Sequence, residues 1–421
     1  MLYAQNTQHG FLSLVGILLE SMRSQRMGSR LALWRSNARP GVRGSLYYLC
    51  FWSSVGMYIP FINVYFTNLG LSGQQIAMFG AISPLAVLLF NPLVGATADR
   101  RGWHVQLLLS MLALTGLSQI ALAFPTTFFT ILPVMVVLAV VRGPIAPLAD
   151  SMIAGMAVRH QLAYGKLRLW GSVGYAVTSL LGGIWWAKTG YPTMFILTGL
   201  MTGLVAIVAN SLDHTPELRK TAAKSAKAPR DAAFIAIVVI TSLVGAAFSM
   251  VSMFDGNLIQ RISGSTIMLG VLPCVIASTE VPVMLNADRV IARFGTAKTL
   301  AVSTLILGLG FIGSGMVSEA WMLIPIGMFR ACGFGLYSVA IIRLITERIP
   351  TTLLATAQGL ISAIAGGLSP LLATQAGGYM FDISGPQLVF IASGLCIGLA
   401  TLVVWLGLKL NWFKPIAQTN A

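Results

Sequence analysis

Long apolar stretches separated by short polar segments make up most of this chain. The stretches cover approximately residues 45–68, 73–97, 104–124, 127–152, 165–187, 191–211, 233–255, 265–287, 298–317, 320–342, 352–378 and 386–409. A bilayer core about 30 Å thick needs about 20 apolar residues in a helix, so each stretch is long enough to cross it. Because the stretches are continuous and do not alternate, they favour helices over barrel strands. We therefore predict an all-α membrane protein with twelve transmembrane helices.

A polar segment, SLDHTPELRKTAAKSAKAPRD, divides these stretches into two groups of six. We expect two six-helix bundles, over residues 44–211 and 233–410, joined by a basic cytoplasmic linker at 212–232. Residues 1–43 contain six arginines and one acidic residue. We interpret them as a basic cytoplasmic tail, with a transit peptide or a later start as open alternatives, and residues 411–421 as a second cytoplasmic tail.

The positions of Lys and Arg predict the orientation. Basic residues flank every second loop, whereas the alternate loops carry little beyond Lys188 and Arg261. Because cytoplasmic loops retain Lys and Arg, we expect both termini in the cytoplasm and the protein in the cell membrane. This orientation explains the net charge of +15 without nucleic-acid binding.

Composition excludes several function classes. The chain is 56% hydrophobic and 9% charged, which rules out a water-soluble domain. Its four cysteines lie in separate apolar stretches and its histidines in polar segments, so we predict no metal site. The chain contains no GxxxxGK[ST] loop of an ATP-driven pump and no HExxH motif, and we expect no enzyme activity.

Two loops at equivalent places in the two halves are similar. NPLVGATADRRGWHVQLLL follows the second stretch and VPVMLNADRVIARFGTAKTL follows the eighth, so Ala-Asp-Arg recurs at 98–100 and 287–289. Gly95 can allow close helix contact, Asp99 can accept hydrogen bonds and Gly102 permits a turn. We interpret Gly95, Asp99, Arg100 and Gly102, with Asp288 and Arg289 in the second copy, as latches on the cytoplasmic face.

The first loop resembles the signature of the major facilitator superfamily, although Trp103 and His104 stand where members usually have basic residues. Residues 147–175, PLADSMIAGMAVRHQLAYGKLRLWGSVGY, resemble the phenylpropionate-permease and lactose-permease-like branch of proton symporters. The resemblance covers about residues 45–410. It implies the two-bundle facilitator fold and alternating access about a central cavity.

Two charges inside the apolar stretches are expected to lie close together. Asp150 and Arg168 are each nine residues from Arg159, at the turn between the fourth and fifth stretches, so they lie at similar depth and can meet in the cavity. The resemblance implies that both bind substrate; the alternative is a structural ion pair. Tyr175 lies two turns beyond Arg168 on the same face, where it can stack on a ring or serve only in packing.

The second half contributes two further candidates. Glu280 is an isolated carboxyl that can exchange a proton with water when the cavity opens, so we predict a proton-coupling role; the alternative is a neutral hydrogen-bonding side chain. We expect Arg330 to attract an anionic substrate or to pair with Glu280. Asp255, at the predicted outer end of the seventh stretch, is expected to be solvated.

The resemblance and these residues together predict a monomeric secondary active transporter. It would move a small organic solute, of the aromatic acid, saccharide or nucleoside class, by proton symport. Its partners would be the solute, protons and the lipid bilayer, with the proton gradient in place of a cofactor. The alternatives are a proton-driven exporter of an organic compound, by antiport, and a transporter-like sensor that moves nothing.

Overall fold

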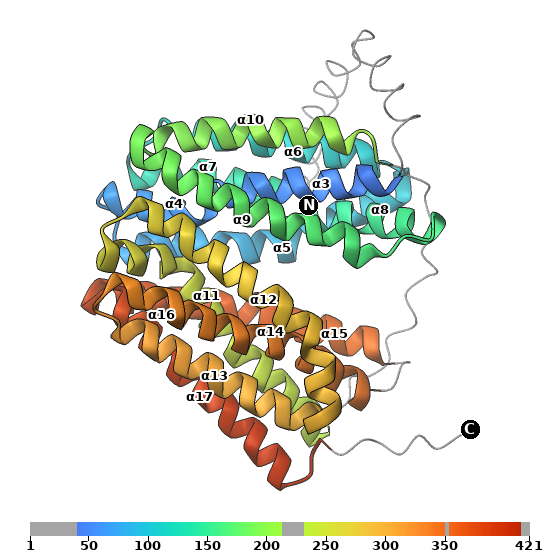
Figure 1. Cartoon of the computed structure of the whole chain (residues 1–421). Helices are drawn as coiled ribbons and strands as arrows, with labels where there is room; N and C mark the ends of the chain where they lie inside the picture. The colour runs from blue at the N-terminus through green and yellow to red at the C-terminus, as the bar shows by residue number, and fades with distance from the viewer. Residues whose placement is uncertain (1–39, 213–230, 350–352, 414–421) are drawn as a thin grey trace, which may run out of the picture.

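The computed structural model describes residues 40–212, 231–349 and 353–413, and these parts are almost entirely helical (Figure 1). The predicted tails at 1–43 and 411–421 and the predicted linker at 212–232 lie largely outside the described residues. The all-α prediction is confirmed.

The first half of the chain forms six spans, two of which are broken helices. Their elements are α3 (Pro40–Gly56) with α4 (Ile59–Asn68), α5 (Gly73–Arg101), α6 (His104–Ala121), α7 (Phe128–Arg142) with α8 (Ile145–Arg159), α9 (Tyr164–Thr189) and α10 (Pro192–Ala209). The fourth span breaks at Gly143 and Pro144, because proline lacks the N–H that a continuous helix requires.

The second half also forms six spans. Its elements are α11 (Ala232–Ser263), α12 (Thr266–Phe294), α13 (Thr296–Met316), η1 (Ala320–Met322) with α14 (Leu323–Arg348), α15 (Leu354–Ala363) with η2 (Ile364–Leu368) and α16 (Ser369–Ser384), and α17 (Pro386–Lys409). The π-helical turn η2 contains Gly366 and Gly367.

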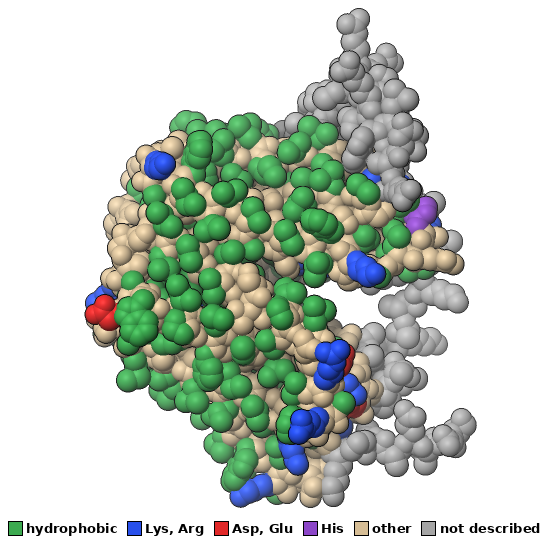
Figure 2. Space-filling view, viewed as in Figure 1, with side chains coloured by type: hydrophobic (Ala, Val, Ile, Leu, Met, Phe, Trp, Pro, Cys, Tyr) green, Lys and Arg blue, Asp and Glu red, His purple; other side chains and the backbone are tan. Residues whose placement is uncertain are grey.

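Within the described residues, eleven helical segments are long and apolar enough to cross a membrane. Helix α9 is not among them, because its Gly, Ser, Trp and Tyr residues keep its mean hydropathy low. It nevertheless packs against α3 and α12, inside the arrangement of the other spans. Leucines such as Leu89, Leu200 and Leu285 are exposed. The face of the molecule in Figure 2 is largely apolar away from the hollow.

The two halves lie against each other at only one end, which we call the closed end (left in Figure 1). There α5 packs against α16, α9 against α12, and α4 against α11. Asn63 donates to the backbone oxygen of Met253 at 2.8 Å, and Asn257 donates to the Thr67 hydroxyl at 2.6 Å. The opposite or open end carries the loops at 102–103, 160–163 and 295, where Figure 2 shows a deep hollow between the halves with Lys and Arg near its rim.

Candidate functional site

A cavity of about 330 Å³ lies between the two halves. That volume is at the lower end of the range for small-molecule sites, roughly 300–1,000 Å³. The charged and aromatic side chains that line it include Trp52, Arg168, Tyr175, Asp255, Glu280 and Arg330. The structure therefore places four of the five predicted substrate and proton residues around one space, and leaves out Asp150.

Arg168 reaches this cavity from α9 between two aromatic rings. Its guanidinium carbon lies 4.4 Å from the ring centre of Trp52 and 5.3 Å from that of Tyr48, both on α3. A guanidinium is attracted to the negative face of an aromatic ring at such distances. In the described part of the chain, Arg168 forms no ion pair with Asp150 or any other acid. Its charge and its hydrogen-bond donors are therefore free to act on a ligand.

Asp150 does not line this cavity. Its carboxylate accepts a hydrogen bond from the Tyr48 hydroxyl at 2.6 Å, and that hydroxyl lies 2.8 Å from the hydroxyl of Tyr164. The expectation that Asp150 and Arg168 meet in the cavity is therefore wrong, although both contact Tyr48. Tyr48 stands between them, with its hydroxyl at Asp150 and its ring at Arg168.

Tyr175 lies on the same side of α9 as Arg168, as its spacing predicts. Its ring lies 6.4 Å from that of Trp52 in an edge-on arrangement, and the two form an aromatic wall of the cavity. Tyr175 also lines a smaller adjoining cavity of about 130 Å³ toward the closed end.

Arg330 pairs with Asp255 and not with Glu280, so the expected pairing with Glu280 is wrong. Its Nη1 atom lies 3.2 Å from Asp255 Oδ1 and 3.4 Å from the Ser314 hydroxyl. The guanidinium also lies over the rings of Phe311 and Phe390, and its side chain is only 10% exposed. The sequence placed Asp255 at a solvated helix end, but α11 continues to Ser263 and carries Asp255 into the cavity wall.

Glu280 lies on α12 and lines the cavity across from Arg168. Among the described residues, nothing forms a hydrogen bond or ion pair with its carboxyl group. Because Asp255 balances Arg330, the cavity is left with one unbalanced cation, Arg168, and one unpaired carboxyl, Glu280. This arrangement can donate hydrogen bonds to a solute from one side and exchange a proton at the other.

Sequence reasoning missed Trp52, Tyr48 and Asp255. The two aromatic residues are indistinguishable by type from the packing aromatics around them, so no signal in the sequence marks them. For Asp255 the sequence was misleading, because Gly256 and Asn257 follow it directly and resemble a helix end, whereas α11 ends only at Gly264.

The first predicted latch is at the open end. Asp99 lies 3.0 Å from the Nε2 atom of His104 in its own half, and Gly102 ends α5 with a φ of 66°, which glycine adopts without strain. Gly95 faces open space, so the prediction that it allows close helix contact is wrong for this conformation, in which the halves are apart at that end.

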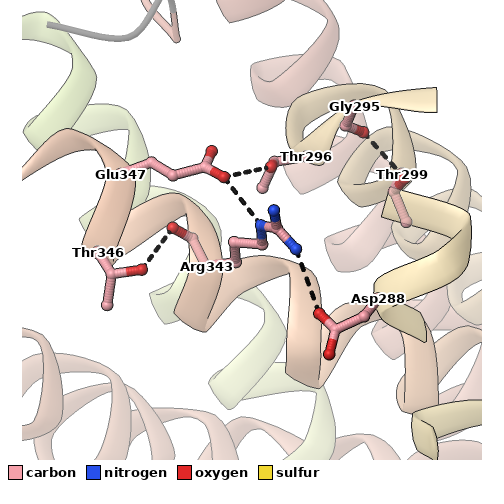
Figure 3. Close-up of polar contacts among 7 residues, drawn as sticks. All are labelled: Asp288, Gly295, Thr296, Thr299, Arg343, Thr346 and Glu347. Carbon is pink, nitrogen blue, oxygen red and sulfur yellow. Dashed lines mark hydrogen bonds and ion pairs between the residues drawn. The ribbon is translucent and has the colours of Figure 1, made fainter. Parts of the chain in front are cut away.

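The second latch also bonds within its own half (Figure 3). Asp288 lies 3.2 Å from Arg343 on α14, and Arg343 lies 2.9 Å from Glu347, which accepts a hydrogen bond from Thr296. Arg289 donates to the neighbouring Asn286. In both latches the acidic residue thus bonds to a residue of its own half.

Comparison with known proteins gives consistent results. The model of the MFS_1 like family matches residues 42–392. The chain is 26% identical to the maltose permease of Geobacillus stearothermophilus, over 89% of this chain and 95% of the relative. It is 22% identical to a probable 3-phenylpropionic acid transporter of Escherichia coli (strain K12), over 81% and 91%. A crystal structure of the nucleoside transporter NupG has the same fold, with a TM-score of 0.74, 13% identity and coverage of 90% and 100%.

Proposed function

We propose a substrate class and a coupling mode for this chain, which belongs to the MFS_1 like family and is a multi-pass secondary transporter of small solutes, not an enzyme. The proposed substrate is a small saccharide, and the proposed mode is proton symport by alternating access. The observation that carries the proposal is the unpaired Arg168 and the unpaired Glu280 facing one cavity from different halves.

The cavity lining supports a saccharide. Sugars present hydroxyl groups at their edges and C–H groups on their faces. Arg168 can donate paired hydrogen bonds to neighbouring hydroxyls, while Trp52 and Tyr175 offer apolar faces. The similarity to a maltose permease over 89% of the chain favours the same class.

Glu280 is the proposed proton carrier. A charged carboxyl without a partner is costly inside a membrane, so Glu280 favours binding a proton before the cavity closes. The Asp255 carboxylate is less suited, because it already forms an ion pair with Arg330. Coupling follows if solute and proton each stabilise the same closed intermediate.

Alternating access would proceed by rocking of the halves, which we place at residues 44–211 and 233–410. The open end carries the basic loops, so we assign it to the cytoplasm, together with both termini. The structure then corresponds to an inward-facing state. In the outward-facing state the rim residues Asp99, Arg100, Asp288 and Arg289 would close the cytoplasmic side.

A second candidate substrate is an aromatic carboxylate. Arg168 provides a cation that no acid in the described part of the chain balances, and Trp52 and Tyr175 lie beside it. A guanidinium can bind a carboxylate through two parallel hydrogen bonds. The similarity to a probable 3-phenylpropionic acid transporter favours this class over a nucleoside.

The test is uptake into proteoliposomes with an alkaline interior, using radiolabelled maltose and 3-phenylpropionate. We expect the imposed pH gradient to drive accumulation of maltose, and Arg168→Ala to lower the rate at least about tenfold, because each charged hydrogen bond contributes ~1.5–3 kcal/mol. The conservative variant Arg168→Lys should retain part of the activity. Accumulation of 3-phenylpropionate alone would select the second candidate. Export only, or binding without flux, would contradict symport.

A further inference from the structure

The position of the Arg168 guanidinium is restricted by the residues packed against it, in addition to its attachment to helix α9. Gly171, one turn later on α9, leaves the space that the guanidinium and Trp52 occupy, because a Cβ atom there would lie 2.6 Å from each. On the other side the guanidinium contacts the ring of Tyr48, which is only 2% exposed. The direction in which Arg168 points into the cavity therefore depends on where the Tyr48 ring lies.

The Tyr48 ring is in turn fixed by its hydroxyl. Its single hydroxyl proton is donated to the carboxylate of Asp150, so the Tyr164 hydroxyl must be the donor in their contact. The result is a chain of hydrogen bonds from Tyr164 through Tyr48 to Asp150. Such chains strengthen each bond and restrict rotation. Tyr164 lies four residues before Arg168, on the same face of α9.

We propose that Tyr48 is a positioning residue for Arg168, and that Asp150 acts on the solute only through Tyr48. The proposal rests on the proposed function, in which Arg168 binds the solute. It assigns Asp150 the task of fixing a tyrosine hydroxyl, because Asp150 does not line the cavity and its Oδ1 atom accepts the hydrogen bond from that hydroxyl. Three helices, α3, α8 and α9, thus set the orientation of one guanidinium.

The neighbouring residue Tyr47 provides a matched control. It lies on the same helix, is 1% exposed and stacks on Phe51. Its hydroxyl has no hydrogen-bond partner among the described residues. Tyr47→Phe and Tyr48→Phe therefore remove the same atom from equally buried rings, and only the second removes the hydrogen bonds to Asp150 and Tyr164.

The first experiment needs no solute. Purified full-length protein is treated with phenylglyoxal, and modification of Arg168 is followed by peptide mass spectrometry relative to Arg330, which lines the same cavity. We expect Tyr48→Phe and Asp150→Ala each to speed modification of Arg168 about fivefold, the effect of losing one buried hydrogen bond. Tyr47→Phe should leave the rate unchanged. Asp150→Asn keeps an acceptor oxygen and should retain most of the protection.

The second experiment measures maltose binding by titration calorimetry in a double-mutant cycle. Tyr48→Phe and Asp150→Ala should each weaken binding about fivefold, and the double variant no further, because both remove the same interaction. Additive losses, or an Asp150→Ala variant that weakens binding with Arg168 labelled at the wild-type rate, would overturn the proposal. Absence of maltose binding in the wild type would contradict only the proposed substrate, since the labelling result stands without it.

Discussion

At the scale of single residues, the site depends on which charges have partners. Arg330 and Asp255 neutralise each other within the cavity wall, and Arg168 is stabilised by two aromatic rings without an acid. Glu280 differs from both, because nothing in the described part of the chain forms a hydrogen bond or ion pair with its carboxyl group. Arg330 and Asp255 therefore form a structural ion pair, whereas we assign Arg168 to the solute and Glu280 to the proton.

The tight packing around Arg168 predicts that one methyl group added at Gly171 strongly weakens solute binding. Gly171→Ala should displace the guanidinium or Trp52 and weaken maltose binding about tenfold or more, because overpacking a tight contact costs ~1–3 kcal/mol. Gly165→Ala is the control, since a Cβ atom at that position on the same helix meets nothing within 4 Å. Calorimetric affinities that are equal for the two variants would show that this contact does not orient Arg168.

The Arg330–Asp255 pair predicts a loss of stability. Asp255→Asn should destabilise the protein by about 2–4 kcal/mol, because it leaves a buried guanidinium without its counter-charge. Asp288→Asn makes the same chemical change at an exposed pair and should change the stability far less, because water and salt screen such a pair. Thermal unfolding in detergent measures both. A smaller shift for Asp255→Asn than for Asp288→Asn would contradict the buried pairing.

At the scale of helices, the closed end is stabilised by an acidic residue of the second half, Asp382, which caps the N-terminus of helix α5 in the first half. Asp382 on α16 accepts hydrogen bonds from the backbone N–H groups of Gly73, at 2.5 Å, and Gln74, at 3.0 Å. These N–H groups begin α5, where the helix dipole favours a negative charge. Opening the closed end must break this contact, so Asp382 stabilises the conformation observed here.

Asp382→Ala is therefore expected to shift the population toward a state open at that end. Each of the two charge-assisted hydrogen bonds contributes about 1.5–3 kcal/mol. Their loss is therefore enough to raise the population of the state open at that end at least tenfold. Spin labels at the ends of α5 and α16 would report the change as a longer distance in pulsed electron resonance. Glu319→Ala, at an exposed acid in the loop between α13 and α14, is the control. Unchanged distances in Asp382→Ala would exclude this role for the helix cap.

Hydropathy predicts most of the helices because a membrane span must be long and apolar, and the break at Gly143 and Pro144 follows from proline chemistry. The contacts inside the site follow no such rule. The spacing of Asp150 and Arg168 predicts equal depth, yet Tyr48, about a hundred residues earlier in the chain, lies between them. Asp255 was misplaced because a polar residue facing a cavity resembles a helix end. The sequence therefore predicts how deep a charged residue lies in its span, whereas the packing of the helices decides which residue it contacts.

At the scale of the whole molecule, the halves line a central cavity between them. They lie apart at the basic end, where Figure 2 shows the hollow, and are in contact at the other end. Rocking of the halves would expose the same residues to the other side. Because Arg168 and Glu280 belong to different halves, their separation changes when the halves move. Solute and proton can thereby favour the same movement.

The most direct test of this account compares the wild type with Glu280→Gln in proteoliposomes. For Glu280→Gln we predict maltose exchange between equal concentrations at a rate near that of the wild type, with no accumulation when a pH gradient is imposed. The wild type should do both. If Glu280→Gln still accumulates maltose against its gradient, the proton is carried elsewhere and the central claim is contradicted.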